Sequence, residues 1–224
     1  MHKQDRIVLK NNERNFRQAA RSSKPYQLLM GSCYVDSIAK RTGNNWCICR
    51  MINVKHGISQ ILQYEQLVPT HVLFVTSWAN AMAILNKEQI VVHPPLWRKI
   101  LTSIDKIGAP ILMIDMPAAF HRYKFHIEKI DRFVIRAYKR RERYKSEVIH
   151  LKHRNHITYI DLMDSIDHKY CDINENRNNS ITKSPWHVGR YTIKHTIEAY
   201  RRFVEGCLDL NYFDCLKKSY GTKH

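Results

Sequence analysis

Apolar residues in this chain fall into five short continuous runs, and the stretches between them have the three- to four-residue spacing of amphipathic helices. The runs lie at residues 26–30, 46–54, 71–76, 111–115 and 156–162. Continuous apolar runs are typical of strands buried on both faces, as in parallel sheets covered by helices on each side. The pattern therefore predicts an α/β protein: a three-layer α/β/α fold with a flavodoxin-like, five-stranded parallel sheet.

Helices are expected where the apolar spacing changes to that of one helix face. They lie at residues 35–40, 58–66, 96–107, 127–144 and 191–208. The third of these helices follows two prolines, and Gly108 is expected to end it. The closing helix is expected to bury one face, made of Ile193, Ile197, Tyr200 and Val204.

The polar ends of the chain suggest a single α/β domain with two extensions. We expect a basic N-terminal arm over 1–25, with a short helix around 15–22, the domain over 26–210, and a basic tail over 211–224. No run approaches the ~18 apolar residues of a membrane span, and the polar N-terminus does not have the pattern of a secretory signal. We therefore expect a cytoplasmic protein, with a peripheral membrane position as an open alternative.

The charge of the chain is strongly positive. There are 37 Lys and Arg against 20 Asp and Glu, a formal net charge of +17. Such an excess favours an anionic partner, which can be nucleic acid, a membrane surface or another anionic polymer. The densest basic segment spans 122–154 and contains a cluster that we single out as a candidate anion-binding surface: Lys139, Arg140, Arg141 and Arg143. The alternative is the ordinary solvated face of an amphipathic helix.

The six cysteines and seven glycines argue against a metal or nucleotide cofactor. The cysteines lack the paired spacing of zinc sites, and the glycines form neither a dinucleotide-binding nor a phosphate-binding loop. Cys47 and Cys49 alternate along a strand, so we expect both thiols to be buried and reduced. We predict no cofactor and no metal.

Polar residues that suit acyl-transfer chemistry follow several of the predicted strands. Ser32 comes after the first strand and Gly57 after the second. Asn80 follows the third strand, and His187 lies in the loop between the fifth strand and the closing helix. Acyl transfer needs a nucleophile, hydrogen-bond donors for the developing oxyanion and a base, and ligands of parallel sheets bind beyond the carboxyl ends of the strands. The sequence thus predicts a candidate ester-cleaving site at that edge.

In this order of residues the chain resembles the SGNH (GDSL-like) hydrolase superfamily, which is named for its Ser, Gly, Asn and His. Ser32, Gly57, Asn80 and His187 match the four, separated by 25, 23 and 107 positions, and Gly31-Ser32-Cys33 is similar to the GSCFA-like branch. The resemblance implies an ester hydrolase or O-acyltransferase acting on an acylated glycan or a lipid-like ester. It implies Ser32 as nucleophile and His187 as base, with the oxyanion held by the amides of Ser32 and Gly57 and the side chain of Asn80.

One departure from the family pattern concerns the group that orients the histidine. Ser184 stands where the family has an aspartate three residues before its histidine, so the orienting group is Ser184, an acid from the preceding loop such as Asp172, Asp167 or Asp164, or absent. Losing this role in a triad costs on the order of 10⁴ in turnover. A non-catalytic scaffold that binds nucleic acid or another anionic surface through its basic face therefore remains an alternative function. Cys33 remains an alternative nucleophile.

Overall fold

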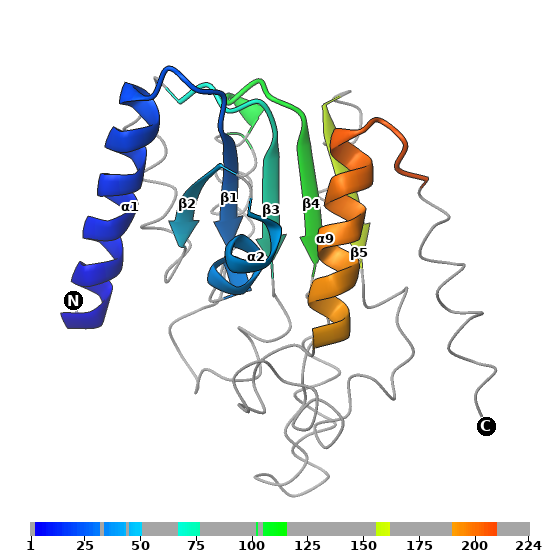
Figure 1. Ribbon diagram of the computed structural model, residues 1–224, viewed down its shortest axis with the longest axis horizontal. Coiled ribbons are helices and arrows are strands. Elements are labelled where there is room, and N and C mark those ends of the chain that lie inside the picture. Colours follow the sequence, from blue (N-terminus) through cyan, green and yellow to red (C-terminus); the bar gives the residue numbers. More distant parts are fainter. Residues whose placement is uncertain are drawn as a thin grey trace, which may run out of the picture. The chain divides into compact units, whose positions relative to one another are not determined.

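The computed structural model describes residues 3–31, 34–43, 45–50, 67–76, 102, 105–115, 156–161 and 190–209. They form a five-stranded sheet of order β2-β1-β3-β4-β5 (Figure 1). The strands are β1 (Gln27–Gly31), β2 (Trp46–Arg50), β3 (Val72–Thr76), β4 (Ile111–Asp115) and β5 (Ile157–Asp161). The helices among these residues are α1 (Lys3–Arg21), α2 (Tyr34–Thr42) and α9 (Arg190–Val204).

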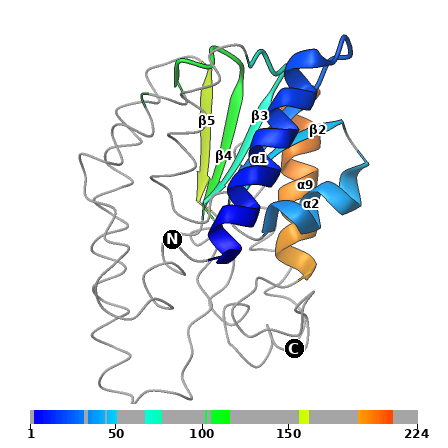
Figure 2. The same ribbon diagram turned by 90° about the vertical axis from the view of Figure 1, so that its left-hand side faces the viewer.

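The strands are parallel, with the order of a flavodoxin-like sheet. β1 pairs in parallel register with both β2 and β3. At the amino ends of the next strands, the Val72 N–H donates to the Pro110 carbonyl (2.9 Å), and the Ile111 N–H donates to the His156 carbonyl (2.7 Å). The starts of β3, β4 and β5 therefore lie side by side (Figure 2), which confirms the predicted sheet.

Both faces of the central strands are covered. Leu28, Leu29 and Met30 of β1 are fully buried, and so is each residue from Ile111 to Ile114 in β4. Because successive residues of a strand point to opposite faces, continuous burial requires a layer of protein on each side. This burial confirms the three-layer arrangement and explains why these strands are apolar throughout.

Helix α1 lies beside the edge strand β2 (Figure 1), and its side chains pair the open edge of that strand in place of a further strand. The Asn12 side-chain amide donates to the Arg50 carbonyl (2.9 Å), and its oxygen accepts the Arg50 N–H (2.9 Å). Asn15 donates to the Ile48 carbonyl (2.9 Å). An open strand edge presents unpaired backbone groups, and these two asparagines pair them.

The N-terminal segment is therefore a packed helix and not an arm with a short helix around 15–22. α1 is 19 residues long, and its buried side chains include Val8, Asn12, Phe16 and Ala19. Their spacing of three and four residues forms one helix face. The face was hard to recognise in the sequence because one of its central members is polar and is satisfied only by the edge of β2.

The amino edge of the sheet carries its own polar contacts. The Tyr26 hydroxyl accepts the Val68 N–H (2.9 Å), and burial raises the pKa of that phenol, a rise that this hydrogen bond opposes. His156 Nε2 lies 2.9 Å from Asp105 Oδ1, joining the turn before β4 to the start of β5. These contacts tie loops to the end of the sheet opposite the predicted site.

Contacts divide the chain into two compact units. One comprises Met1–Val75, Val92–Met113 and Glu147–Thr158, and the other comprises Thr76–Val91, Ile114–Ser146 and Tyr159–His224. α9 belongs to the second unit, and its fully buried side chains are Ile193, Thr196, Ala199 and Tyr200. Ile193 and Tyr200 are buried as expected, whereas Ile197 and Val204 are only half-buried, because the buried face is rotated toward Thr196 and Ala199.

The other predicted helices, over 58–66, 96–107 and 127–144, lie wholly or mostly outside the described residues. The expected stop at Gly108 is confirmed, since this glycine has φ +70° and its N–H donates to the Asp105 carbonyl (3.2 Å). No helix in the described ranges is both long and apolar enough to cross a membrane.

Candidate active site

The predicted site lies where β1 and β3 end side by side. Gly31, the last residue of β1, is in register with Val75 of β3, and α2 begins three residues later at Tyr34. The strand order reverses at β1, because the chain places β2 on one side of β1 and then β3 on the other side. Such switch points, at the carboxyl ends of the strands, are where α/β sheets bind ligands.

Gly31 is required at this strand end for two reasons. Its φ is +151°, a conformation that residues with a side chain rarely adopt. A Cβ atom built on it would overlap the backbone carbonyl oxygen of Val75 and lie 3.2 Å from Cγ1 of Val35. The close approach of β1, β3 and α2 thus leaves room only for hydrogen at the position before Ser32.

The rim of this edge carries an ion pair between β2 and α2. Arg50 Nη1 lies 3.3 Å from Asp36 Oδ2, and both side chains are well exposed. Exposed pairs contribute little to stability, but Asp36 also lies in the first turn of α2, where a carboxylate is favoured by the helix dipole. The pair and the Asn12 bonds to the Arg50 backbone both lie at the carboxyl end of β2.

The thiols of β2 are unsuited to nucleophilic chemistry. Cys47 and Cys49 are free and buried, as predicted. Burial raises the pKa of the Cys47 thiol to about 12 and raises that of Cys49 as well. A thiol with a pKa this high carries almost no thiolate at neutral pH, so both cysteines act as packed apolar side chains.

Two strands end in carboxylic residues that the sequence analysis did not single out. Asp115 is the last residue of β4, and Asp161 is the last residue of β5. An acidic residue at the end of a strand-like run was the available signal. Neither side chain is described, so we assign them a position in the fold and no contacts.

The residues predicted to act in catalysis fall outside the described part of the chain. They are Ser32, Gly57, Asn80, His187, Ser184, Asp172 and the alternative nucleophile Cys33. The basic cluster Lys139, Arg140, Arg141 and Arg143 also lies outside it. The structure describes the elements on either side of Ser32 in the sequence, which are β1 before it and α2 after it. Within the described ranges, no three His, Cys, Asp or Glu residues gather as a metal site would require.

Comparisons with known proteins show which solved structures share this fold. No protein-family model matches the chain, and no curated protein does. Among solved structures, a predicted acylhydrolase from Bacteroides fragilis NCTC 9343 superposes with a TM-score of 0.54 at 14% identity, over 88% of this chain and 97% of that one. A GDSL-like lipase from Bacteroides thetaiotaomicron VPI-5482 superposes with a TM-score of 0.52 at 14% identity, over 89% and 100%. The chain thus shares the α/β fold of these two proteins.

Proposed function

We propose that this protein is a serine ester hydrolase or O-acyltransferase in which Ser32 is the nucleophile. The observation that carries the proposal is Gly31, whose positive φ and close approach to Val75 suit the tight strand-to-helix turn that a strand-end nucleophile needs. The strand order supports it, because Ser32 directly follows the strand at the switch point. The two structural neighbours, described as an acylhydrolase and a lipase, support it further.

The proposed reaction has two steps, in which Ser32 is first acylated and then deacylated. Ser32 Oγ attacks the ester carbonyl while His187 accepts its proton, and the resulting oxyanion accepts hydrogen bonds from the Ser32 and Gly57 amides and the Asn80 side chain. The tetrahedral intermediate then collapses, the ester C–O bond breaks, and His187 returns the proton to the leaving alcohol. The acyl group stays on Ser32 until water or an acceptor hydroxyl, deprotonated by His187, attacks it; the bond between the acyl carbon and Ser32 Oγ then breaks, and His187 returns the proton to Oγ.

The group that orients His187 is proposed to be either Ser184 or Asp172. A serine can hold the ring by a hydrogen bond but supplies no charge to the imidazolium. Asp172 carries a charge but lies 15 residues before the histidine, so it must reach the ring through the fold of its loop. A loss in turnover in Asp172→Asn comparable to that in His187→Ala would identify the carboxylate as the orienting group.

The substrate is proposed to be an acylated glycan or a lipid-like ester. A non-catalytic scaffold that binds an anionic partner is the second candidate, and one observation favours it. The exposed side of α1 carries Lys10, Arg14, Arg17 and Arg21, which fits an anionic surface whether or not Ser32 is active.

Turnover of p-nitrophenyl acetate tests the first candidate. Ser32→Ala is expected to lower kcat by about 10³–10⁶, and Asn80→Ala by about 10²–10³. Ser37→Ala, a serine on α2 five positions further along, is the matched control and is expected to keep full turnover. A wild-type protein that is folded and inactive, or a Ser32→Ala variant with unchanged kcat, would refute the enzymatic proposal and leave the binding scaffold.

A further inference from the structure

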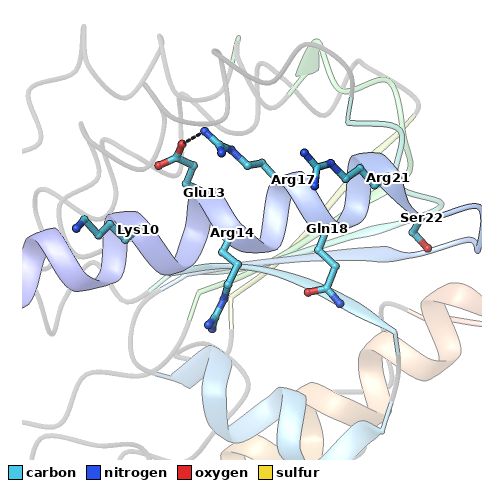
Figure 3. A pocket seen from close by; sticks show the side chains of 7 residues that line it. All are labelled: Lys10, Glu13, Arg14, Arg17, Gln18, Arg21 and Ser22. Atoms are coloured by element: carbon cyan, nitrogen blue, oxygen red, sulfur yellow. Dashed lines mark hydrogen bonds and ion pairs between the residues drawn. The ribbon is translucent and has the colours of Figure 1, made fainter.

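One face of α1 carries a row of cations. Four basic residues spaced four, three and four positions apart fall within an arc of about 60° on a helix of 3.6 residues per turn. They are Lys10, Arg14, Arg17 and Arg21, and we call them the basic face of α1. All four are exposed, and with Glu13, Gln18 and Ser22 they line a pocket whose described lining belongs to this segment (Figure 3).

The row is held rigidly and points outward. The opposite face of α1 is fixed to the sheet through buried Phe16 and through the hydrogen bonds of Asn12 and Asn15 to the edge of β2. Eleven residues separate the first and last cations, so the row spans about 16 Å along the helix axis. A cationic row on a preformed helix loses little backbone entropy when it binds a partner.

The charge of the row is only partly neutralised within the described residues. Glu13 pairs with Arg17, and Figure 3 draws this contact. No carboxylate of the described ranges pairs with Lys10, Arg14 or Arg21. The basic face therefore keeps at least three positive charges for a partner.

We propose that the basic face of α1 docks the protein on an anionic phospholipid surface. Clusters of basic residues on a helix are attracted to anionic head groups, by about fivefold in affinity per residue. Ile7, one turn before Lys10, has 51% of its surface exposed. Burying this apolar side chain among the lipids would strengthen the binding beyond the electrostatic attraction. Single-stranded nucleic acid is a poorer fit, because the described exposed side chains of α1 include no aromatic ring on which a base could stack.

The position of α1 connects this surface to the proposed ester chemistry. Asn12 bonds Arg50, the last residue of β2, so the end of α1 that carries Ile7 and Lys10 lies toward the carboxyl edge of the sheet. Because the row continues to Arg21 at the other end of the helix, docking through α1 would lay the helix along the lipid surface, with Ile7 and Lys10 nearest that edge. The role of the surface in presenting a lipid-like ester rests on the proposed function, whereas the binding itself does not.

Sedimentation of the full-length protein with vesicles tests the proposal. Vesicles of phosphatidylcholine mixed with phosphatidylserine are compared with vesicles of phosphatidylcholine alone. The double variant Arg14→Gln/Arg21→Gln is expected to bind the anionic vesicles about 30-fold more weakly than wild type. The matched control is Lys40→Gln/Arg41→Gln, which removes two exposed charges from α2 and is expected to bind almost as wild type does.

Several results would overturn the inference. Equal losses in the two double variants would assign the binding to overall charge and not to α1. Tight binding to heparin or duplex DNA without binding to anionic vesicles would assign the surface to a different polyanion. An Ile7→Ser variant that bound the vesicles as wild type does at high salt, where electrostatic attraction is screened, would remove the apolar contact from the proposal.

Turnover of soluble p-nitrophenyl acetate separates this inference from the proposed function. The α1 variants are expected to keep wild-type turnover, which also shows that they are folded. Vesicle binding without any esterase activity would support docking and refute the enzyme. Esterase activity without vesicle binding would support the enzyme and refute docking.

Discussion

Replacing Gly31 by alanine tests the packing at the end of β1. The new Cβ would overlap the Val75 carbonyl oxygen and press on Cγ1 of Val35. The φ of +151° lies in a region that is populated almost only by glycine and adds a conformational cost of about 1–3 kcal/mol, and overpacking at a closed site adds about 1–3 kcal/mol. We therefore expect Gly31→Ala to lower the free energy of unfolding by about 2–6 kcal/mol, a large part of the ~5–15 kcal/mol of a typical domain.

Gly43, which follows α2, provides the matched control. It also has a positive φ, +63°, but a Cβ built on it meets nothing within 4 Å. Gly43→Ala should therefore cost only the conformational part, about 1–2 kcal/mol. Urea unfolding followed by fluorescence gives both free energies, and similar m-values show that the denatured states are comparable. Equal losses in the two variants would refute the argument that contact with β3 requires glycine at position 31.

Three further predictions follow from polar and titratable groups. Asn12→Ala should lower the free energy of unfolding by about 1–3 kcal/mol and promote self-association, because the partly buried backbone N–H and carbonyl of Arg50 lose both hydrogen bonds. Urea unfolding and light scattering measure the two effects. Burial lowers the pKa of His71 below 6.5, so the contribution of this neutral imidazole to stability should be lost as pH falls below 6.5 toward that lower pKa. A His71→Gln variant should show a weaker dependence of Tm on pH in this range, and an unchanged dependence would contradict the assignment. Buried Cys47, with a pKa raised to about 12, should resist alkylation in the folded protein while exposed Cys207 reacts; rapid native-state labelling of Cys47 in peptide mapping would contradict this burial.

The sheet could be predicted from the sequence because its signals are local. Each strand is a short apolar run, and burial on both faces of β1, β3 and β4 explains why these three runs do not alternate with polar residues. The turn after β1 and the helix stop at Gly108 could also be predicted, since glycine is the residue that adopts a positive φ without strain. These features depend on neighbours within a few positions.

The packing of α1 could not be predicted, because it depends on tertiary contacts. Asn12 is a polar residue in the middle of a buried helix face, and only the unpaired edge of β2 makes it favourable there. A basic composition and this interruption together suggested an exposed arm. The rotation of the buried face of α9 toward Thr196 has the same origin, since a threonine is buried where an apolar residue was expected.

The strand end before Ser32 could be predicted from the sequence, whereas the distances between the candidate catalytic residues could not. Gly31 marks the turn before Ser32 by local chemistry alone. The proposed pairing of Ser32 with His187, 155 positions later, would depend on how the loops after the strands fold, which periodicity and composition do not encode. The same holds for the choice between Ser184 and Asp172 as the orienting group.

The most direct test of the account is the site at which a fluorophosphonate probe attaches, mapped by mass spectrometry of the digested protein. The account predicts a single adduct on Ser32 that is absent from Ser32→Ala, strongly reduced in His187→Ala and retained in Cys33→Ala. An adduct on a different residue, or a folded wild-type protein that acquires none, would contradict it.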